Sequence, residues 1–247
     1  MRKHLLMRLR APLVAFGGEA VDNYGVIRDF PAVSMVTGLI ANALGWHRSD
    51  FECLDRLQRR LVMGSRLDRD GDPLRDFQTA QLASNDTGWT TFGEPETRRG
   101  GDESYKSPHL RHRDYRAGLD ALVALRLEPA GEDPSLGAIA RALDRPQRPL
   151  FIGRKPCLPS ARLFVDIIDA SDVLDALQRA PAPVEQERFR FQWPQGEGAL
   201  DRASAHEVCD ERNWKSGVHG GWRPVLEGTG PCIRPESFTT ISPEYDS

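Results

Sequence analysis

The chain has 247 residues, of which 39% are hydrophobic and 28% are charged, a balance that supports one large folded domain or two small ones. It contains no stretch of about 18 apolar residues, and its N-terminus returns to charge at Arg8, so neither a transmembrane helix nor a signal peptide is predicted. A cytoplasmic protein with no membrane partner is therefore expected. The net charge of −3 excludes an overall basic field for nucleic acid, so the distribution of charge carries more information than its sum.

The first predicted element is a strand near the N-terminus. Apolar and polar side chains alternate over 4–10, which is typical of a half-buried strand. This alternation places Arg8 and Arg10 together on the open face of the strand.

Two helices are predicted next. Ser34 is a suitable N-cap for an amphipathic helix that ends at Leu44, and Gly45 can terminate it. A second helix with a leucine-rich face follows at about 50–61.

A long projecting hairpin is predicted in the middle of the chain. A strand at 62–67 leads to the turn Asp70-Gly71, and a second strand covers 74–80. The stretch 81–112 is polar and has no helical period, and a segment of this length inside a domain is usually functional or mobile. We therefore interpret 73–116 as a hairpin inserted into the domain.

The remaining elements define the fold class. A strand at 119–127, a helix at 135–143 and a short apolar strand at 150–152 complete the order β-α-(α)-β-hairpin-β-α-β. This order predicts an α+β fold with a ferredoxin-like, RNA-recognition-type sheet that carries the hairpin as a thumb. Next follow another strand and a short helix after Ser171. The alternating rings of Phe189, Phe191 and Trp193 come after them, and for these rings packing in the core is favoured over an exposed aromatic platform. The expected divisions are an RNA-binding domain at 1–160, a β-rich C-terminal extension at 161–225 and a tail at 226–247.

The cysteines do not predict a metal site. The chain has four cysteines, which are widely spaced, and without a secretion signal they are expected to be free thiols. A zinc site formed by His206, Cys209, His219 and Cys232 would have a spacing that fits no defensible zinc motif. We expect neither a metal nor a cofactor.

Basic residues gather in three short runs. One run lies at the N-terminus, one at 106–116 and one at 154–162, each with little acidic compensation. A single run is usually a solvated surface, but three of them on a net acidic chain favour an anion-binding surface.

Five short motifs, taken in order, resemble the CasD family of Cascade subunits, within the repeat-associated mysterious protein superfamily. The resemblance covers about 4–165, and the last motif is the most specific. The motifs are Leu9-Arg10-Ala11-Pro12-Leu13, Phe30-Pro31 with Ser34, Gly38 and Leu39, Leu74-Arg75-Asp76 with Thr79, Arg113-Asp114-Tyr115, and the run from Pro149 to Cys157.

The resemblance implies a function and a set of partners. Members of this family hold the 5′ handle of the CRISPR RNA in type I-E Cascade, an antiviral surveillance complex, and cap one end of its backbone. Their thumb kinks the RNA. They contact the CasC backbone subunit and the large CasA subunit, and they meet target DNA indirectly through the complex. A separate subunit, CasE, cleaves the precursor RNA, so a non-catalytic role is expected here.

The candidate RNA-binding residues combine positive charge, flat side chains and glycine, which suit single-stranded RNA. They are Arg8, Arg10, Ser34, Gly38, Arg75, Lys106, Arg111, His112, Arg113, Tyr115, Gly153, Arg154 and Lys155. Gly38 either allows a backbone to approach closely or packs the helix on the sheet. Trp214 and Trp222 either cover RNA or face a partner subunit. The chain departs from the family pattern at Val33, Met35 and Phe77-Gln78, and the last departure removes a candidate acid–base histidine.

Two alternatives stay open. A metal-independent endoribonuclease would need a general base and a general acid, and His112 could meet Tyr115 or Lys155 only through folding. A protein-only scaffold would use the basic runs against acidic partners and would show no salt-sensitive RNA binding.

Overall fold

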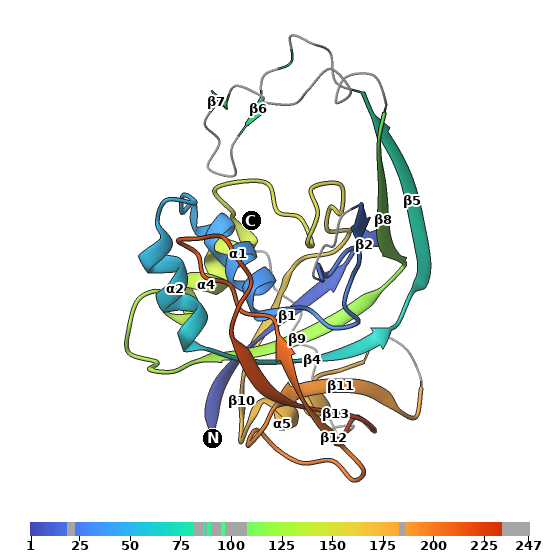
Figure 1. Ribbon diagram of the computed structural model, residues 1–247. Helices are drawn as coiled ribbons and strands as arrows, with labels where there is room; N and C mark the ends of the chain where they lie inside the picture. The colour runs from blue at the N-terminus through green and yellow to red at the C-terminus, as the bar shows by residue number, and fades with distance from the viewer. Residues whose placement is uncertain are drawn as a thin grey trace, which may run out of the picture.

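The computed structural model describes residues 1–18, 23–81, 86, 88–89, 95–96, 108–182 and 186–233. It is an α+β fold organised on one large antiparallel sheet (Figure 1). The seven strands of this sheet lie in the order β10 (Phe164–Ala170), β1 (Arg2–Arg10), β9 (Asp120–Leu127), β4 (Leu61–Arg69), β11 (Phe189–Pro194), β13 (Trp222–Gly230) and β12 (Ser204–Cys209).

Helices cover the two faces of the sheet, and each face has its own apolar core. Helices α1 (Val33–Leu44), α2 (Phe51–Arg60) and α4 (Leu136–Asp144) pack on one face, and α5 (Val173–Arg179) packs on the other. Strand β1 contributes to both cores because successive side chains point to opposite faces: Leu5 and Met7 lie under the three helices, whereas Leu6 lies under α5. The face that was expected to be open is thus partly closed by α5.

The rings predicted to belong to the core do so. Phe189, Phe191 and Trp193 are at most 2% exposed and pack against α5. Their alternation therefore marks the buried face of β11, in agreement with the interpretation favoured from sequence.

The strand predicted at 150–152 is wrong. Leu150 and Ile152 are buried in the core, but the backbone N–H of Ile152 donates to the carbonyl of Cys157 in a tight loop. The strand that follows α4 in the sheet is instead β10, which pairs with β1. The sheet therefore continues across the boundary expected at residue 160.

The C-terminal part is more regular than expected. Strand β13 pairs with β11 as far as Gly230 and with β12 on its other side, and Val225 is fully buried. The sheet therefore extends beyond the tail boundary expected at residue 226, and 234–247 lie outside the described residues.

A second sheet projects from the first (Figure 1). Strand β8 (His109–Ala117) is its centre, with β5 (Asp72–Ala80) on one side and the short β2 (Leu13–Val14) and β3 (Tyr24–Gly25) also paired to β8. Strands β5 and β8 pair along nine positions, which forms the two arms of a long hairpin. The described part of the segment between them includes a small pair, β6 (Gly88–Trp89) with β7 (Pro95–Glu96).

The start of α1 is capped by a distant residue. The helix begins at Val33, so the prediction of Ser34 as N-cap is wrong, and Ser34 is buried within the first turn. The Asp210 carboxylate accepts from the backbone N–H of Val33, and the Asp210 carbonyl accepts from that of Ser34. Arg223 holds the same carboxylate at 2.8 Å.

No helix in the described parts of the chain is long and apolar enough to cross a membrane.

Candidate nucleic-acid interface

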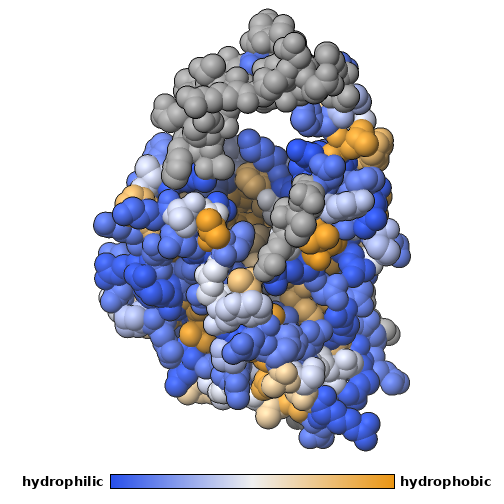
Figure 2. Space-filling model, in the orientation of Figure 1, coloured by the Kyte–Doolittle hydropathy of each residue, from blue (hydrophilic) through white to orange (hydrophobic). Residues whose placement is uncertain are grey.

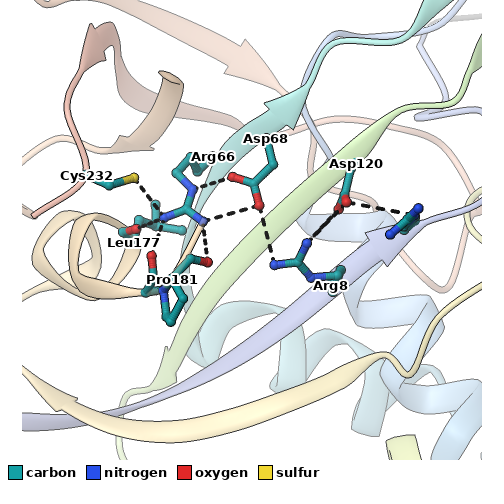
Figure 3. Close-up of polar contacts among 9 residues, drawn as sticks. Arg8, Arg66, Asp68, Asp120, Leu177, Pro181 and Cys232 are labelled. Atoms are coloured by element: carbon teal, nitrogen blue, oxygen red, sulfur yellow. Dashed lines mark hydrogen bonds and ion pairs between the residues drawn. The ribbon is translucent and has the colours of Figure 1, made fainter. Parts of the chain in front are cut away.

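Arg8 is held in a buried ionic chain rather than exposed on an open face (Figure 3). Its guanidinium lies 3.2 Å from Asp120 and 3.5 Å from Asp68, and its side chain is 16% exposed. Asp68 in turn pairs with Arg66 at 2.6 Å, and both of these side chains are fully buried. The expectation that Arg8 lies on an open face is therefore wrong, because carboxylates on β4 and β9 pair with it.

Arg10 keeps a more open position at the end of β1. Its side chain is 49% exposed, and its contact with Asp120 is long, at 4.0 Å. Arg10 therefore stays available to an external anion, whereas Arg8 does not.

Gly153 fixes the loop that carries the next two candidates. Its φ is +85°, and a Cβ at this position would lie 1.8 Å from the carbonyl oxygen of Ala15. Only glycine fits such a close approach in the left-handed region. The loop is thereby pressed against the segment that follows β1.

Arg154 is oriented by the protein itself. Its guanidinium donates to the carbonyl of Asp114 at 2.8 Å and to that of Gly25 at 2.7 Å, and it lies over the Tyr115 ring at 4.8 Å. Tyr115 is 5% exposed and belongs to the core. Arg154 thus joins the loop to β8 and β3, while Lys155 is exposed and free of partners among the residues described.

Alternation along β8 gives the hairpin two different surfaces. One surface, which we call the arginine face, carries Arg111, Arg113 and Tyr115. The other, which we call the ring face, carries His112 and Asp114. In Figure 2, hydrophobic and hydrophilic surface lie side by side at the upper right of the molecule, where Figure 1 draws β5 and β8.

Two guanidinium groups converge on the arginine face. The position that a Cβ on Gly25 would occupy lies 2.8 Å from a terminal nitrogen of Arg113 and 2.8 Å from one of Arg154. The two nitrogens are therefore no more than twice that distance apart. In the part of the chain described here, the Arg113 side chain forms no hydrogen bond or ion pair, and its cross-strand neighbour on β5 is Asp76. A pair of close guanidiniums with spare donors is suited to an oxyanion such as a phosphate.

Three aromatic side chains meet on the ring face. Tyr24 stacks on His112 with ring centres 4.9 Å apart and an angle of 9° between planes, and Phe77 lies 5.2 Å from His112 on the other side. Tyr24 and Phe77 are 51% and 55% exposed. This is an unusual amount of ring surface to leave in water without a ligand or partner.

The charges on the ring face are compensated. Arg75 binds Asp114 at 2.6 Å, and Arg116 binds Asp29 at 2.7 Å. Arg75, predicted as an RNA contact, is thus engaged by a carboxylate. Its guanidinium hydrogen bond holds the pKa of the Asp114 carboxyl below its ordinary value.

The Arg75–Asp114 pair predicts a pH effect. A carboxyl whose pKa is lowered by folding stabilises the protein at neutral pH, and this contribution is lost as the pH falls through the lowered pKa. We expect Arg75→Gln to raise the pKa of Asp114, measured from its carboxyl carbon shift by NMR. Asp144, whose pKa is lowered by Arg162 in the same way, is the internal control and should not move. An unchanged Asp114 titration would show that Arg75 does not hold this carboxyl in solution.

Comparison with known proteins identifies the family. The family model described as CRISPR-associated protein (Cas_Cas5) matches residues 4–226. The chain belongs to the Cas5 family. A curated relative, the CRISPR system Cascade subunit CasD of Escherichia coli strain K12, is 27% identical over 177 residues, which cover 72% of this chain and 76% of the relative.

Solved structures share the fold of this Cas5 chain. A chain of a CRISPR RNA-guided surveillance complex matches with a TM-score of 0.68 and 23% identity, covering 92% of this chain and 90% of that one. A chain described as the crystal structure of a Cas protein matches with a TM-score of 0.61 and 25% identity, covering 93% and 95%.

Not all predicted site residues of the Cas5 chain come together. Five of them lie close together. Strand β8 carries Arg111 and Arg113, and the loop joined to it by Arg154 carries Gly153, Arg154 and Lys155. In contrast, Arg8 and Ser34 are enclosed elsewhere in the fold. Gly38 lies beside the Trp214 ring, and a Cβ there would be 3.4 Å from it, an ordinary van der Waals contact, so this packing does not by itself require glycine. Lys106 lies outside the described residues.

Sequence reasoning missed two participants, Tyr24 and Gly25. They form a two-residue strand that pairs in parallel with His112 and Arg113, far away in sequence. No local pattern signals such a strand, since neither periodicity nor a hairpin turn accompanies it. Among the residues that the structure describes, no three or more His, Cys, Asp or Glu side chains form a group that could hold a metal ion.

Proposed function

We propose that this Cas5 protein is a non-catalytic subunit of a type I-E Cascade complex that binds the 5′ handle of the CRISPR RNA and caps one end of the backbone. Family membership and the similarity to CasD support the complex. The observation that carries RNA binding is the convergence of Arg113 and Arg154 beside Gly25. Bringing two like charges together is unfavourable without a counter-charge, and a phosphodiester between them supplies one.

The proposal includes partners, location and fold type. CasC and CasA are the expected neighbours, target DNA is reached through the complex, and the cytoplasm is the expected location. Four strands of the large sheet lie in the order β10-β1-β9-β4. Along the chain, α1 and α2 follow β1, and α4 follows β9, which supports a ferredoxin-like description of this unit.

The geometry argues against His112 and Tyr115 as the acid–base pair of the endoribonuclease alternative. His112 and Tyr115 lie on opposite faces of β8, and the Tyr115 ring is buried under Arg154. A general base and a general acid must reach the same phosphodiester, which these two side chains do not do. His112 instead stacks on Tyr24, and the Phe77 ring lies tilted by 44° on its other side.

The test is a titration of handle RNA at several salt concentrations. Arg113→Ala should weaken binding and lower the slope of log affinity against log salt by about 0.7, the value for one phosphate contact in single-stranded nucleic acid. Arg113 is the better target than Arg154, because Arg154 also holds two backbone carbonyls.

A matched control is Arg141→Ala on α4, an exposed arginine without a partner in the described chain. It should leave both affinity and slope unchanged. Equal slopes for wild type and Arg113→Ala would remove this site from the interface. The absence of salt-sensitive RNA binding in the wild type would refute the proposed function.

A further inference from the structure

The rings on the ring face form a series that runs across neighbouring strands, from β5 through β8 to β3. Phe77 on β5, His112 on β8 and Tyr24 on β3 lie side by side, because each occupies the paired position on its strand. The Tyr24–His112 separation of 4.9 Å matches the spacing of neighbouring strands, which is about 4.7–4.9 Å. The stack is therefore built into the strand pairing.

The series is open at Tyr24. Among the strands described, β3 pairs with β8 alone, so no further strand lies beyond Tyr24. Its ring is 51% exposed, and one more flat group could stack at the same spacing. The open end of the series is a site for a planar ring.

The local charges favour a neutral planar group over a phosphate. The two arginines of the ring face, Arg75 and Arg116, are each paired with a carboxylate. Arg113, whose side chain forms no ion pair among the described residues, lies on the opposite face, beside Gly25. A nucleotide has both parts that these surfaces select, an anionic phosphate and a flat uncharged base.

The two surfaces meet at the edge of β3. Gly25 lies on the arginine face and Tyr24, its direct neighbour, lies on the ring face. A chain whose phosphate is bound beside Gly25 needs to cross only this two-residue edge to place a base against Tyr24. Gly25 is itself buried, and the two guanidiniums occupy the space that a side chain would fill, so they line this edge of the arginine face.

We propose that Tyr24 is the stacking site for one unpaired nucleobase of the bound RNA, supported from behind by His112 and Phe77. The proposal rests on the RNA-binding function above and adds a residue, a ligand group and a face of the hairpin to it. Stacking of this kind accepts any base, because every base has an aromatic face.

The test uses handle RNA with a single 2-aminopurine, moved one position at a time, since the fluorescence of this base is quenched when it stacks. With the full-length wild-type protein, one position should be quenched on binding. Tyr24→Leu keeps apolar volume but removes the ring; we expect loss of that quenching and a rise in Kd of roughly 5- to 100-fold, which corresponds to the value of one stacked base.

Two further variants complete the design. Tyr24→Phe keeps the ring and should behave like the wild type, and Arg141→Ala on α4, the control for the salt titration, should also have no effect. Thermal unfolding of each variant checks that the fold is retained.

The outcomes separate the two proposals. If RNA binding depends on salt and on Arg113 but not on Tyr24, the stacking site is refuted and the RNA-binding function stands. If Tyr24→Leu leaves RNA binding intact and weakens association with other Cascade subunits, the ring face binds protein and the inference is also overturned. If the wild type binds no RNA, both proposals fail.

Discussion

Replacing Arg66 with methionine should lower the free energy of unfolding by about 3–5 kcal/mol, the usual result of removing one partner of a buried ion pair. Arg66 and Asp68 are fully buried and form two hydrogen bonds with each other (Figure 3). The same guanidinium donates to the carbonyls of Leu177, Ala180 and Pro181 at the end of α5. The substitution therefore leaves one carboxylate and three carbonyls without their donor.

A double-mutant cycle isolates the ion pair from the carbonyl contacts. Asp68→Leu in the Arg66→Met background removes the carboxylate, which without Arg66 keeps only its 3.5 Å contact with Arg8, and we expect it to recover part of the lost stability. Urea unfolding of the wild type, both single variants and the double variant measures the coupling. Strictly additive losses would mean that the two side chains do not depend on each other.

Gly153→Ala should be the most damaging alanine substitution among the glycines that the structure describes, with a loss of at least about 3 kcal/mol. Two costs combine: a non-glycine residue at φ +85°, and a new Cβ placed 1.8 Å from a backbone oxygen. The neighbouring oxygen belongs to the main chain at Ala15 and cannot rotate away as a side chain would. The loop that carries Arg154 and Lys155 must move, so the affinity for RNA should fall with stability.

Gly137→Ala is the matched control for this substitution. Gly137 lies in the first turn of α4, and its nearest neighbour would be the flexible end of Arg141 at 3.6 Å. Alanine there should be neutral or stabilising by about 0.4–1 kcal/mol. Thermal and urea unfolding compare the two variants, and similar stabilities would contradict the role given to the Gly153 turn.

The elements that sequence predicted well are those with local signals. The alternation in β1, the apolar stripe of α1 before Gly45 and the arms of the hairpin each depend on residues close together in the chain. The strand at 150–152 failed because a short apolar run fits a strand and a buried loop equally well. The core accepts Leu150 and Ile152 in either conformation, and Gly153 decides in favour of the loop.

The candidate site was harder to predict because residues far apart in the sequence determine which of its arginines form ion pairs. Arg8 and Arg113 both look like exposed cations in the sequence. Asp68 and Asp120 form ion pairs with Arg8, whereas no acid among the described residues forms one with the Arg113 side chain. Pairing between strands makes this distinction, and the sequence shows only that the three basic runs exist.

The two surfaces of the hairpin belong to consecutive residues, His112 and Arg113, and this restricts how the hairpin can change in length. Inserting or deleting one residue in β8 shifts its register against β5 and β3 and turns every following side chain to the opposite face. The arginine would then join the rings, and the histidine would lie beside the second guanidinium. Length changes in this arm are therefore compatible with both surfaces only in steps of two residues, or where a bulge absorbs the extra residue.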